Sequence, residues 1–262
     1  MDNFIVLYNP LAGNGTAQDK MRELESLMQG DRLYFSNMLD IRDYGAFFND
    51  MPDGASIIIC GGDGTLNRFL NDTEDIRPDC DIYYYPSGSG NDFARDIGAE
   101  RGAPPVLINR YIERLPKICV NGKEHRFING IGYGIDGYCC EKGDELRGKG
   151  NGEVNYTAIA IKGLLFHYKP TGATITVDGV EHRFEKVWLA PTMIGRYYGG
   201  GMMPTPEQDR LNGDGAVSVM VYYGSGKLKS LAVFPLIFKG EHIKHSEMVA
   251  VLSGRNITVC FD

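Results

Sequence analysis

The stretch IIICGGDGTLNRF, residues 57–69, joins a run of β-branched apolar residues to a glycine-rich turn and a helical pattern. An unbroken apolar run is typical of a strand that is covered on both faces, as in a parallel sheet. Gly61, Gly62 and Gly64 allow backbone angles that other residues avoid, and they let N–H groups approach a neighbour closely. The helix that follows adds the positive end of its dipole. The stretch therefore predicts a strand–turn–helix unit whose turn faces an anion such as a phosphate.

Asp63 lies in the middle of this turn. A carboxylate beside a phosphate is repelled unless a divalent cation lies between them, which favours nucleotide phosphates with Mg²⁺. The turn is not a P-loop, because no Gly-Lys-Ser/Thr follows it. A plainer alternative is a tight turn in which Asp63 caps a helix. The turn alone leaves both interpretations open.

Strands and helices alternate through the first hundred residues, which predicts a parallel sheet with helical crossovers. We expect strands at 4–9, 32–36, 56–60 and 81–86, and helices at 16–30, 41–50, 65–72 and 91–98. Glycine loops also follow the first strand, in YNPLAGNGTA, and the fourth, in YYYPSGSGNDFARDIG. Because parallel strands end at one edge of a sheet, three such loops should meet where open α/β sheets bind ligands.

After about residue 105 the pattern changes to short strands and tight turns. Asn121-Gly122 and Asp178-Gly179 each lie between two alternating runs, which is the signal of a type I′ hairpin. Further strands are expected at 216–224 and 256–261, with one helix at 154–168. We therefore predict an α/β domain over residues 1–110 and a mainly antiparallel β domain over residues 111–262.

The composition narrows the class of protein. The chain has 262 residues and a formal net charge of -7, so bulk attraction to nucleic acid or to an anionic membrane is not expected. No apolar run is long enough to cross a bilayer, and the first ten residues lack the basic region of a signal peptide. The six cysteines show no CxxC spacing, which indicates reduced thiols in a cytoplasmic protein.

The motif GGDGTLN, residues 61–67, resembles one shared by diacylglycerol kinases, sphingosine kinases and NAD kinases. Other segments select the bacterial diacylglycerol kinase group of YegS-like lipid kinases. They resemble that group's motifs in order along nearly the whole chain: YNPLAGNG (8–15), YPSGSGNDFAR (85–95), FINGIGYGIDG (127–137), GGGMMPTPEQDRLNGDGAVSVMVY (199–222) and KGEHIKHSEMV (239–249).

The resemblance implies an ATP-dependent lipid kinase, with ATP and Mg²⁺ bound by the first domain and the lipid by the second. It implies transfer of the γ-phosphoryl group to a lipid hydroxyl, with diacylglycerol giving phosphatidic acid. Catalytic roles carry over to Asp63 and Asp136. A structural Mg²⁺ carries over to Asp214 with the carbonyls of Leu211 and Ala216. ATP contacts carry over to Asn9, Pro10, Leu11, Ala12, Gly13, Gly61, Gly62, Asp63, Gly64, Thr65, Leu66, Asn67, Arg68, Ser89, Asn91 and Asp92.

The implied partner is a lipid at the membrane surface, not a nucleic acid, with peripheral contact at the inner face of the membrane. A homodimer is compatible with the resemblance. Lysines gather locally despite the acidic total, and they mix with apolar residues. This pattern fits either an ordinary solvated surface or a salt-sensitive docking face. The lysines are Lys227, Lys229, Lys239 and Lys244.

The chain departs from the family pattern at several positions. Ala12 replaces a serine, Arg68 replaces a glutamate, and Ser89 replaces a threonine. The usual catalytic base is a glutamate in an Asp-Gly-Glu motif, which does not occur before Asp262, so we expect the last family strand or strands to be missing. The alternatives are a kinase for a sphingoid base or phosphatidylglycerol, and a degenerate member that binds nucleotide or lipid without turnover. An NAD kinase ranks lower, because it would not carry PSGSGNDFAR and FINGIGYGID together.

Three further features have plain interpretations. Gly132–Gly137 form a G-x-G-x-x-G pattern, but we expect no clear helix after it, so a Rossmann site is not indicated. His242 and His245 are expected on an exposed helix face or strand end, not as zinc ligands. Trp188 is expected in the core.

Overall fold

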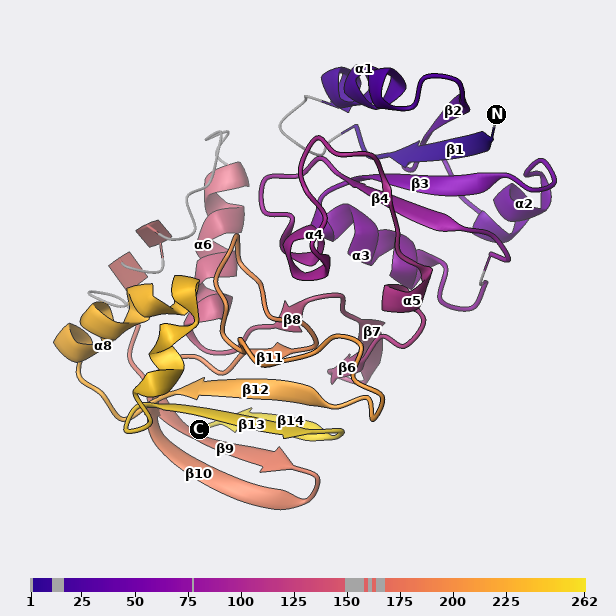
Figure 1. Cartoon of the computed structure of the whole chain (residues 1–262). Coiled ribbons are helices and arrows are strands. Elements are labelled where there is room, and N and C mark those ends of the chain that lie inside the picture. Colours follow the sequence, from indigo (N-terminus) through magenta and orange to yellow (C-terminus); the bar gives the residue numbers. More distant parts are fainter. Residues whose placement is uncertain (1, 11–16, 77, 149–157, 160–161, 164–167) are drawn as a thin grey trace. The chain divides into compact units, whose positions relative to one another are not determined.

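The computed structural model (Figure 1) divides the chain into two compact units, Met1–Ile128 and Asn129–Asp262. The expected boundary at 110/111 lies earlier than this division. The hairpin of β6 (Lys117–Val120) and β7 (Lys123–Arg126) groups with the first unit because Asn71 binds it. The Asn71 amide donates to the Arg126 carbonyl at 3.0 Å and accepts from the Arg126 N–H at 2.9 Å. The residues described are 2–10, 17–76, 78–148, 158–159, 162–163 and 168–262.

The first unit contains a five-stranded sheet in the order β2-β1-β3-β4-β5. The strands β2, β1, β3 and β4 run parallel to one another, as predicted, whereas β5 pairs antiparallel with β4. The strands are β1 (Asn3–Tyr8), β2 (Arg32–Asn37), β3 (Ser56–Gly61), β4 (Ile82–Pro86) and β5 (Val106–Leu107). The helices are α1 (Ala17–Leu27), α2 (Tyr44–Asn49), α3 (Asp63–Asp72), α4 (Asp92–Ile97) and α5 (Asn109–Ile112).

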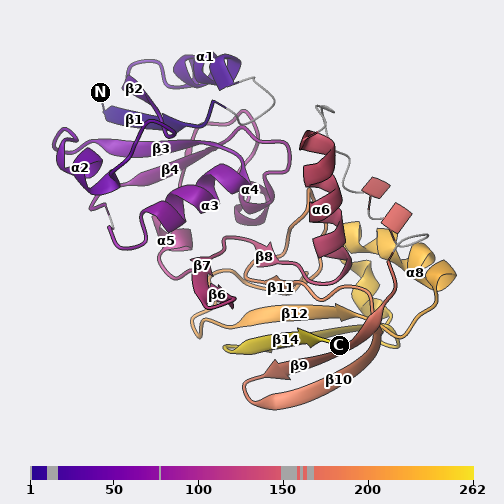
Figure 2. The same cartoon turned by 180° about the vertical axis from the view of Figure 1, so that it is seen from behind.

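Both faces of this sheet are covered, as the apolar run of β3 predicts. Ile57 and Ile59 pack into a cluster with Leu66 and Phe69 of α3. Ile58 points to the other face, into a cluster with Leu24 of α1 and other residues. Figures 1 and 2 show α1 on one face and α3, α4 and α5 on the other. Burial on both faces explains why β3 has consecutive instead of alternating apolar residues.

The second unit is built from two antiparallel sheets, which confirms the predicted class. Their orders are β10-β9-β14 and β13-β12-β11-β8. Between them lies an apolar cluster that includes Ala173, Ile175, Val219 and Val221. The strands are β8 (Gly130–Ile131), β9 (Thr171–Val177), β10 (Val180–Val187), β11 (Thr192–Met193), β12 (Val217–Tyr222), β13 (Val249–Gly254) and β14 (Ile257–Phe261).

Both predicted hairpin turns have the expected backbone. Asn121 and Gly122 have φ of 53° and 78°, and Asp178 and Gly179 have φ of 49° and 86°. A type I′ turn requires positive φ at both central residues, which explains why Asn-Gly and Asp-Gly pairs form these turns.

The helices of the second unit were largely unforeseen. Those whose bounds are described are α6 (Ile135–Gly148), α8 (Lys227–Val233), η3 (Phe234–Lys239) and η4 (Glu241–Lys244), the last two being 3₁₀ helices. The expectation of no clear helix after Gly132–Gly137 is wrong, because α6 begins inside that pattern. The sheet that contains β8 is nevertheless antiparallel, so no Rossmann unit results. The helix predicted at 154–168 lies for the most part outside the described residues.

Candidate nucleotide and lipid kinase site

The ends of β1, β3 and β4 lie side by side at one edge of the first sheet. Tyr8 pairs with Cys60, and Cys60 pairs with Tyr85, so the residues that follow these strands come together. Asn9 and Pro10 directly follow β1, whereas Leu11, Ala12 and Gly13 lie outside the described residues. This arrangement confirms that glycine loops from separate stretches of sequence start at the same edge.

Gly61 of GGDGT and Gly88 of the β4 loop are required by contacts inside the protein. A Cβ atom at position 88 would lie 2.5 Å from the Gly62 Cα, so the β3 and β4 loops touch through two glycines. A Cβ atom at position 61 would lie 2.5 Å from the Cβ of Thr65. Normal carbon–carbon contacts are about 3.5–4.0 Å, so neither position accepts a side chain without movement. The close neighbour implied by these glycines is therefore the protein itself.

Gly64 is different. Apart from its chain neighbours and the nearby backbone of α3, no atom of the described residues lies within 4 Å of the position that its Cβ would take, and the residue is exposed. It is the second residue of α3, a position whose N–H has no acceptor within the helix, whereas the Thr65 and Leu66 N–H groups already donate to the Gly62 carbonyl at 3.0 and 3.1 Å. The N-cap residue is Gly62, which has no side chain to cap the first turn of α3. Gly64 thus offers a backbone N–H donor and open space at the same position.

Asp63 fastens the second loop to the first. Its Oδ2 accepts a hydrogen bond from the Asp92 N–H at 2.9 Å, and its Oδ1 accepts one from the Phe93 N–H at 2.8 Å. Both amides belong to the first turn of α4, where a negative charge is favourable. Asp63 therefore does cap a helix, but the helix is α4 and not α3, the one that its own turn begins. A role of Asp63 toward Mg²⁺ stays a prediction.

Asn91 closes the β4 loop onto itself. Its amide donates to the Gly88 carbonyl at 2.7 Å, and its Oδ1 accepts from the Gly88 N–H at 3.0 Å. Asn91 has φ of 51°, a left-handed conformation that asparagine tolerates better than most residues. Ser87 adds a bond from its N–H to the Gly61 carbonyl at 2.9 Å. Ser87 and Gly88 were not singled out as site residues, because only the fold shows that the two loops touch.

The remaining predicted ATP contacts divide by exposure. Leu66 is fully buried in the core and Thr65 is buried against Gly61, so their side chains are structural. Arg68 is exposed and forms an ion pair with Asp72, with 3.3 Å between Nε and Oδ2. Asn67 is half-buried, Asp92 is buried, and the Ser89 side chain is exposed at the tip of its loop.

Asp136 lies in the second unit, in the first turn of α6. The Tyr198 hydroxyl donates to its carboxylate, with distances of 3.2 Å to Oδ1 and 3.1 Å to Oδ2. Gly132 makes room for this arrangement, since a Cβ atom there would lie 2.6 Å from Asp136 Oδ2. Burial raises the pKa of the Asp136 carboxyl to about 7, and the Tyr198 hydrogen bond opposes this shift. Tyr198 has no signal in the sequence beyond its place just before GGG.

The Asp214 loop is closed by side-chain amides. The Ala216 carbonyl accepts from Gln208 Nε2 at 3.0 Å and from Asn212 Nδ2 at 2.7 Å. The Ala216 N–H donates to Asn212 Oδ1 at 2.9 Å and to Asp214 Oδ1 at 3.2 Å. A carbonyl has two lone pairs, so a cation here would have to displace an amide. The loop as folded does not fit the expected Mg²⁺, and its metal stays a prediction.

Among the described residues, no group of three or more His, Cys, Asp or Glu side chains is placed to hold a metal ion. No helix in the described part of the chain is long and apolar enough to cross a membrane.

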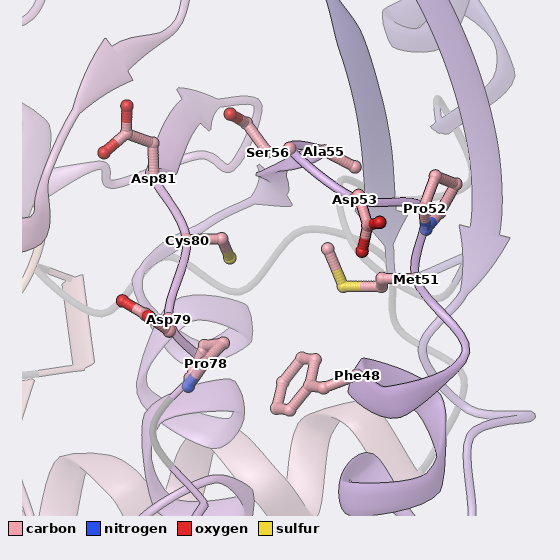
Figure 3. Close-up of a pocket in the computed structure, with 11 residues that line it drawn as sticks. Phe48, Met51, Pro52, Asp53, Ala55, Ser56, Pro78, Asp79, Cys80 and Asp81 are labelled. Carbon is pink, nitrogen blue, oxygen red and sulfur yellow. The ribbon is translucent and has the colours of Figure 1, made fainter.

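A cavity of about 330 Å³ lies in the first unit at the other edge of the sheet, before β3 and β4 begin. Figure 3 shows Phe48, Met51 and Cys80 pointing toward its middle. None of the predicted site residues lines it. The cavity therefore takes no part in the candidate site.

His242 corrects another expectation. Its side chain is fully buried, not on an exposed face, and its Nε2 lies 3.0 Å from the Pro204 carbonyl oxygen. Burial lowers the pKa of His242 to about 4, so the imidazole is neutral near pH 7. A neutral ring that donates to a buried carbonyl is a structural element. Trp188 is also buried, as predicted.

Comparisons with known proteins identify the family. Residues 3–117 match the diacylglycerol kinase catalytic domain, and residues 129–262 match the YegS C-terminal NAD kinase beta sandwich-like domain. The chain therefore belongs to the diacylglycerol kinase catalytic domain family, in the group with a YegS-type second domain.

Individual relatives are distant. The chain is 26% identical over 200 residues to a diacylglycerol kinase of Mycobacterium tuberculosis, covering 74% of this chain and 63% of the relative. It is 28% identical over 207 residues to a diacylglycerol kinase of Bacillus subtilis, covering 76% of this chain and 65% of the relative. The matches thus span less than two thirds of these curated relatives.

The crystal structure of a diacylglycerol kinase from Bacillus anthracis matches with a TM-score of 0.58 at 18% identity. The match covers 98% of this chain and 85% of the other. It shows that the two proteins share a fold.

Proposed function

We propose that this protein is an ATP-dependent lipid kinase that transfers the γ-phosphoryl group to the hydroxyl of diacylglycerol. The observation that carries this proposal is the open first turn of α3 at Gly64, in a chain whose two halves match this family. The reaction converts ATP and the lipid alcohol into ADP, a lipid phosphate monoester and a proton. A sphingoid base or phosphatidylglycerol would undergo the same chemistry.

In this proposal the ATP phosphates lie against the first turn of α3. The Gly64 N–H and the helix dipole favour a negative group, and the exposed Gly64 lets that group approach the backbone. The exposed Ser89 hydroxyl offers a further donor from the neighbouring loop. Asp63 keeps the two loops together through α4. When bound, Mg²⁺ would neutralise charge on the phosphates, and Asp63 is the carboxylate of the first unit that is proposed to act toward it.

Asp136 is proposed as the contribution of the second unit to the reaction. Both of its carboxylate oxygens accept a hydrogen bond from the Tyr198 hydroxyl, which limits rotation of the carboxylate. A fixed carboxylate needs little reorganisation when charge develops nearby. Tyr198 is therefore proposed as a positioning residue, which orients Asp136 without contacting the substrate.

A labelled-ATP assay with separate acceptors tests the function. The protein is incubated with γ-labelled ATP and Mg²⁺ and with diacylglycerol, phosphatidylglycerol, sphingosine or NAD, and the products are separated. We expect labelled phosphatidic acid. Label on a different lipid would identify that lipid as the acceptor in place of diacylglycerol. Label on NAD would contradict the assignment to the lipid kinases. ATP binding without label on any acceptor would indicate a member that binds nucleotide without turnover.

A further inference from the structure

Helices α8 and η3 carry apolar side chains on their outer side. Leu228 is 83% exposed, the largest value for a large apolar residue in the described part of the chain, and Phe238 is 37% exposed. Ala232 and Pro235 are also exposed. The spacings of four, three and three residues bring these side chains to one side of the helical segment. We call these four residues the outer stripe.

The inner side of the same segment is also apolar. Val233, Phe234 and Ile237 are buried, in one cluster with Ile135 and Cys139 of α6. The outer stripe is therefore not a core face that has lost its partner, because the segment already has a core face. A helix that is apolar on two sides needs a second apolar medium on its outer side.

Lysines flank the outer stripe. Between residues 227 and 247 there are four lysines and two glutamates, although the whole chain has a formal net charge of -7. Lys227 and Lys229 lie on either side of Leu228, and Lys239 follows Phe238, all three exposed. Glu247 pairs with Lys229 at 2.8 Å, and Glu241 pairs with Lys244 at 3.1 Å. By sequence alone, the segment has two more lysines than glutamates.

We infer that the outer stripe docks on the surface of an anionic phospholipid bilayer. Leu228 and Phe238 enter the boundary between headgroups and acyl chains, and the lysines face the lipid phosphates. Apolar side chains flanked by lysine are the pattern of helices that lie in a membrane interface. Four side chains are too few for a stable protein dimer, which buries roughly 1,200–2,000 Å².

The inference deepens the proposed function, on which it rests for the need to reach a bilayer lipid. The buried side of α8 and η3 contacts Ile135, the residue next to Asp136. Docking through the outer stripe would thus bring the bilayer to helices that pack against α6, the helix that carries Asp136. Lys227, Lys229 and Lys239 give this contact its dependence on anionic lipid and on salt.

Vesicle co-sedimentation without ATP tests the inference. Wild-type protein is compared with the double variant Leu228→Ser, Phe238→Ser and with the charge variant Lys227→Glu, Lys239→Glu. Matched controls are Val180→Ser, at an apolar residue that is 60% exposed elsewhere in the second unit, and Lys123→Glu, at an exposed lysine of the first unit. Vesicles contain phosphatidylcholine alone or with phosphatidylserine, at low and high salt.

We expect wild-type protein to bind the phosphatidylserine vesicles at low salt and to release at high salt. Each stripe variant should weaken binding at least about fivefold, since one lysine near the surface changes affinity by about that factor. The controls should bind as wild type. The inference would be overturned if the stripe variants bound as tightly as wild type. It would also be overturned if wild-type protein bound neutral and phosphatidylserine vesicles equally, or bound neither. A self-association that Leu228→Ser abolishes would assign the stripe to a second copy and overturn it as well.

Activity toward a soluble short-chain diacylglycerol separates this inference from the proposed function. If the stripe variants phosphorylate the soluble lipid as wild type does but lose activity toward vesicles, both proposals hold. Docking by a protein that phosphorylates no lipid would overturn the function and leave the docking surface standing.

Discussion

The substitution Gly88→Ala tests the contact between the two loops. A Cβ atom there would lie 2.5 Å from the Gly62 Cα and 3.0 Å from Asn91 Oδ1. Since normal carbon contacts are about 3.5–4.0 Å, the loops must separate by roughly 1 Å. Backbone faces backbone here, so no side chain can move aside. Overpacking of this kind costs about 1–3 kcal/mol, and we expect a loss of about 2 kcal/mol in the first unit.

Gly64→Ala is the matched control. It adds the same methyl group at the start of α3, where no described atom lies within 4 Å except the chain neighbours and the nearby backbone of that helix. Gly64 lies in the first turn of α3, so alanine should keep the stability within about 1 kcal/mol of wild type. The methyl group should instead obstruct the proposed phosphate site and lower ATP affinity by at least about tenfold.

The assay must follow the first unit. The chain has one tryptophan, Trp188, which lies in the second unit, so its fluorescence does not report on the loops. Urea unfolding is therefore followed by far-UV circular dichroism, and hydrogen exchange is measured at the amides of Asp92 and Phe93. Gly88→Ala should speed exchange at both amides and Gly64→Ala should not. Equal stability of the two variants, or unchanged ATP binding by Gly64→Ala, would refute the assignment of the glycines.

Four other residues give separate tests. Asp63→Asn keeps one acceptor but removes one of the two caps on α4, so we expect a loss of about 1 kcal/mol in urea unfolding. Because Asp63 is also a proposed catalytic carboxylate, phosphoryl transfer should fall by at least ~10²-fold, and wild-type turnover would remove it from the site. Tyr198→Phe should lower kcat without a matching change in KM for ATP, whereas unchanged kcat would remove its positioning role. His242 has a pKa of about 4 when folded and near 6.5 when unfolded, so the unfolded chain binds the extra proton between these values. Stability measured by tryptophan fluorescence should therefore fall by up to about 3 kcal/mol from pH 7.5 to about pH 4, and a His242→Gln variant with the same fall would contradict this assignment. If Asp214 binds Mg²⁺, added Mg²⁺ should raise Tm and Asp214→Ala should abolish the rise, whereas the amide-closed loop predicts a Tm that EDTA leaves unchanged.

The sequence predicted the elements whose signals are local. Continuous apolar residues in β3 require burial on both faces, and that fixed the parallel sheet and the edge where its loops lie. Asn121-Gly122 and Asp178-Gly179 predicted their turns because few other residue pairs adopt positive φ twice.

Other elements depend on tertiary contacts. Helix α6 contains Gly137 and Gly143, which disfavour helix, and it is held by burial of Ile135 and Cys139. The buried His242 ring donates a hydrogen bond to the Pro204 carbonyl, a partner that lies 38 residues away in sequence.

The candidate site shows the same limit. The glycines of the local motif indicated that another group lies close to the backbone at Gly61 and Gly62. The motif could not distinguish a ligand from a second loop of the protein. The partner of Gly62 is Gly88, and the partners of Asp63 are two amides of α4. These contacts join residues from different loops, and only the pairing of β3 with β4 brings them together.

The central claim is that a nucleotide phosphate binds at the first turn of α3, and the amide signal of Gly64 tests it most directly. Isotope-labelled protein is titrated with a non-hydrolysable ATP analogue and Mg²⁺, and amide shifts are followed by NMR. We predict a large, saturable shift at Gly64 and none at Gly54, an exposed glycine of the same unit that lines the cavity at the other sheet edge. Saturable binding that leaves Gly64 unchanged, or no binding at millimolar analogue, would contradict the account.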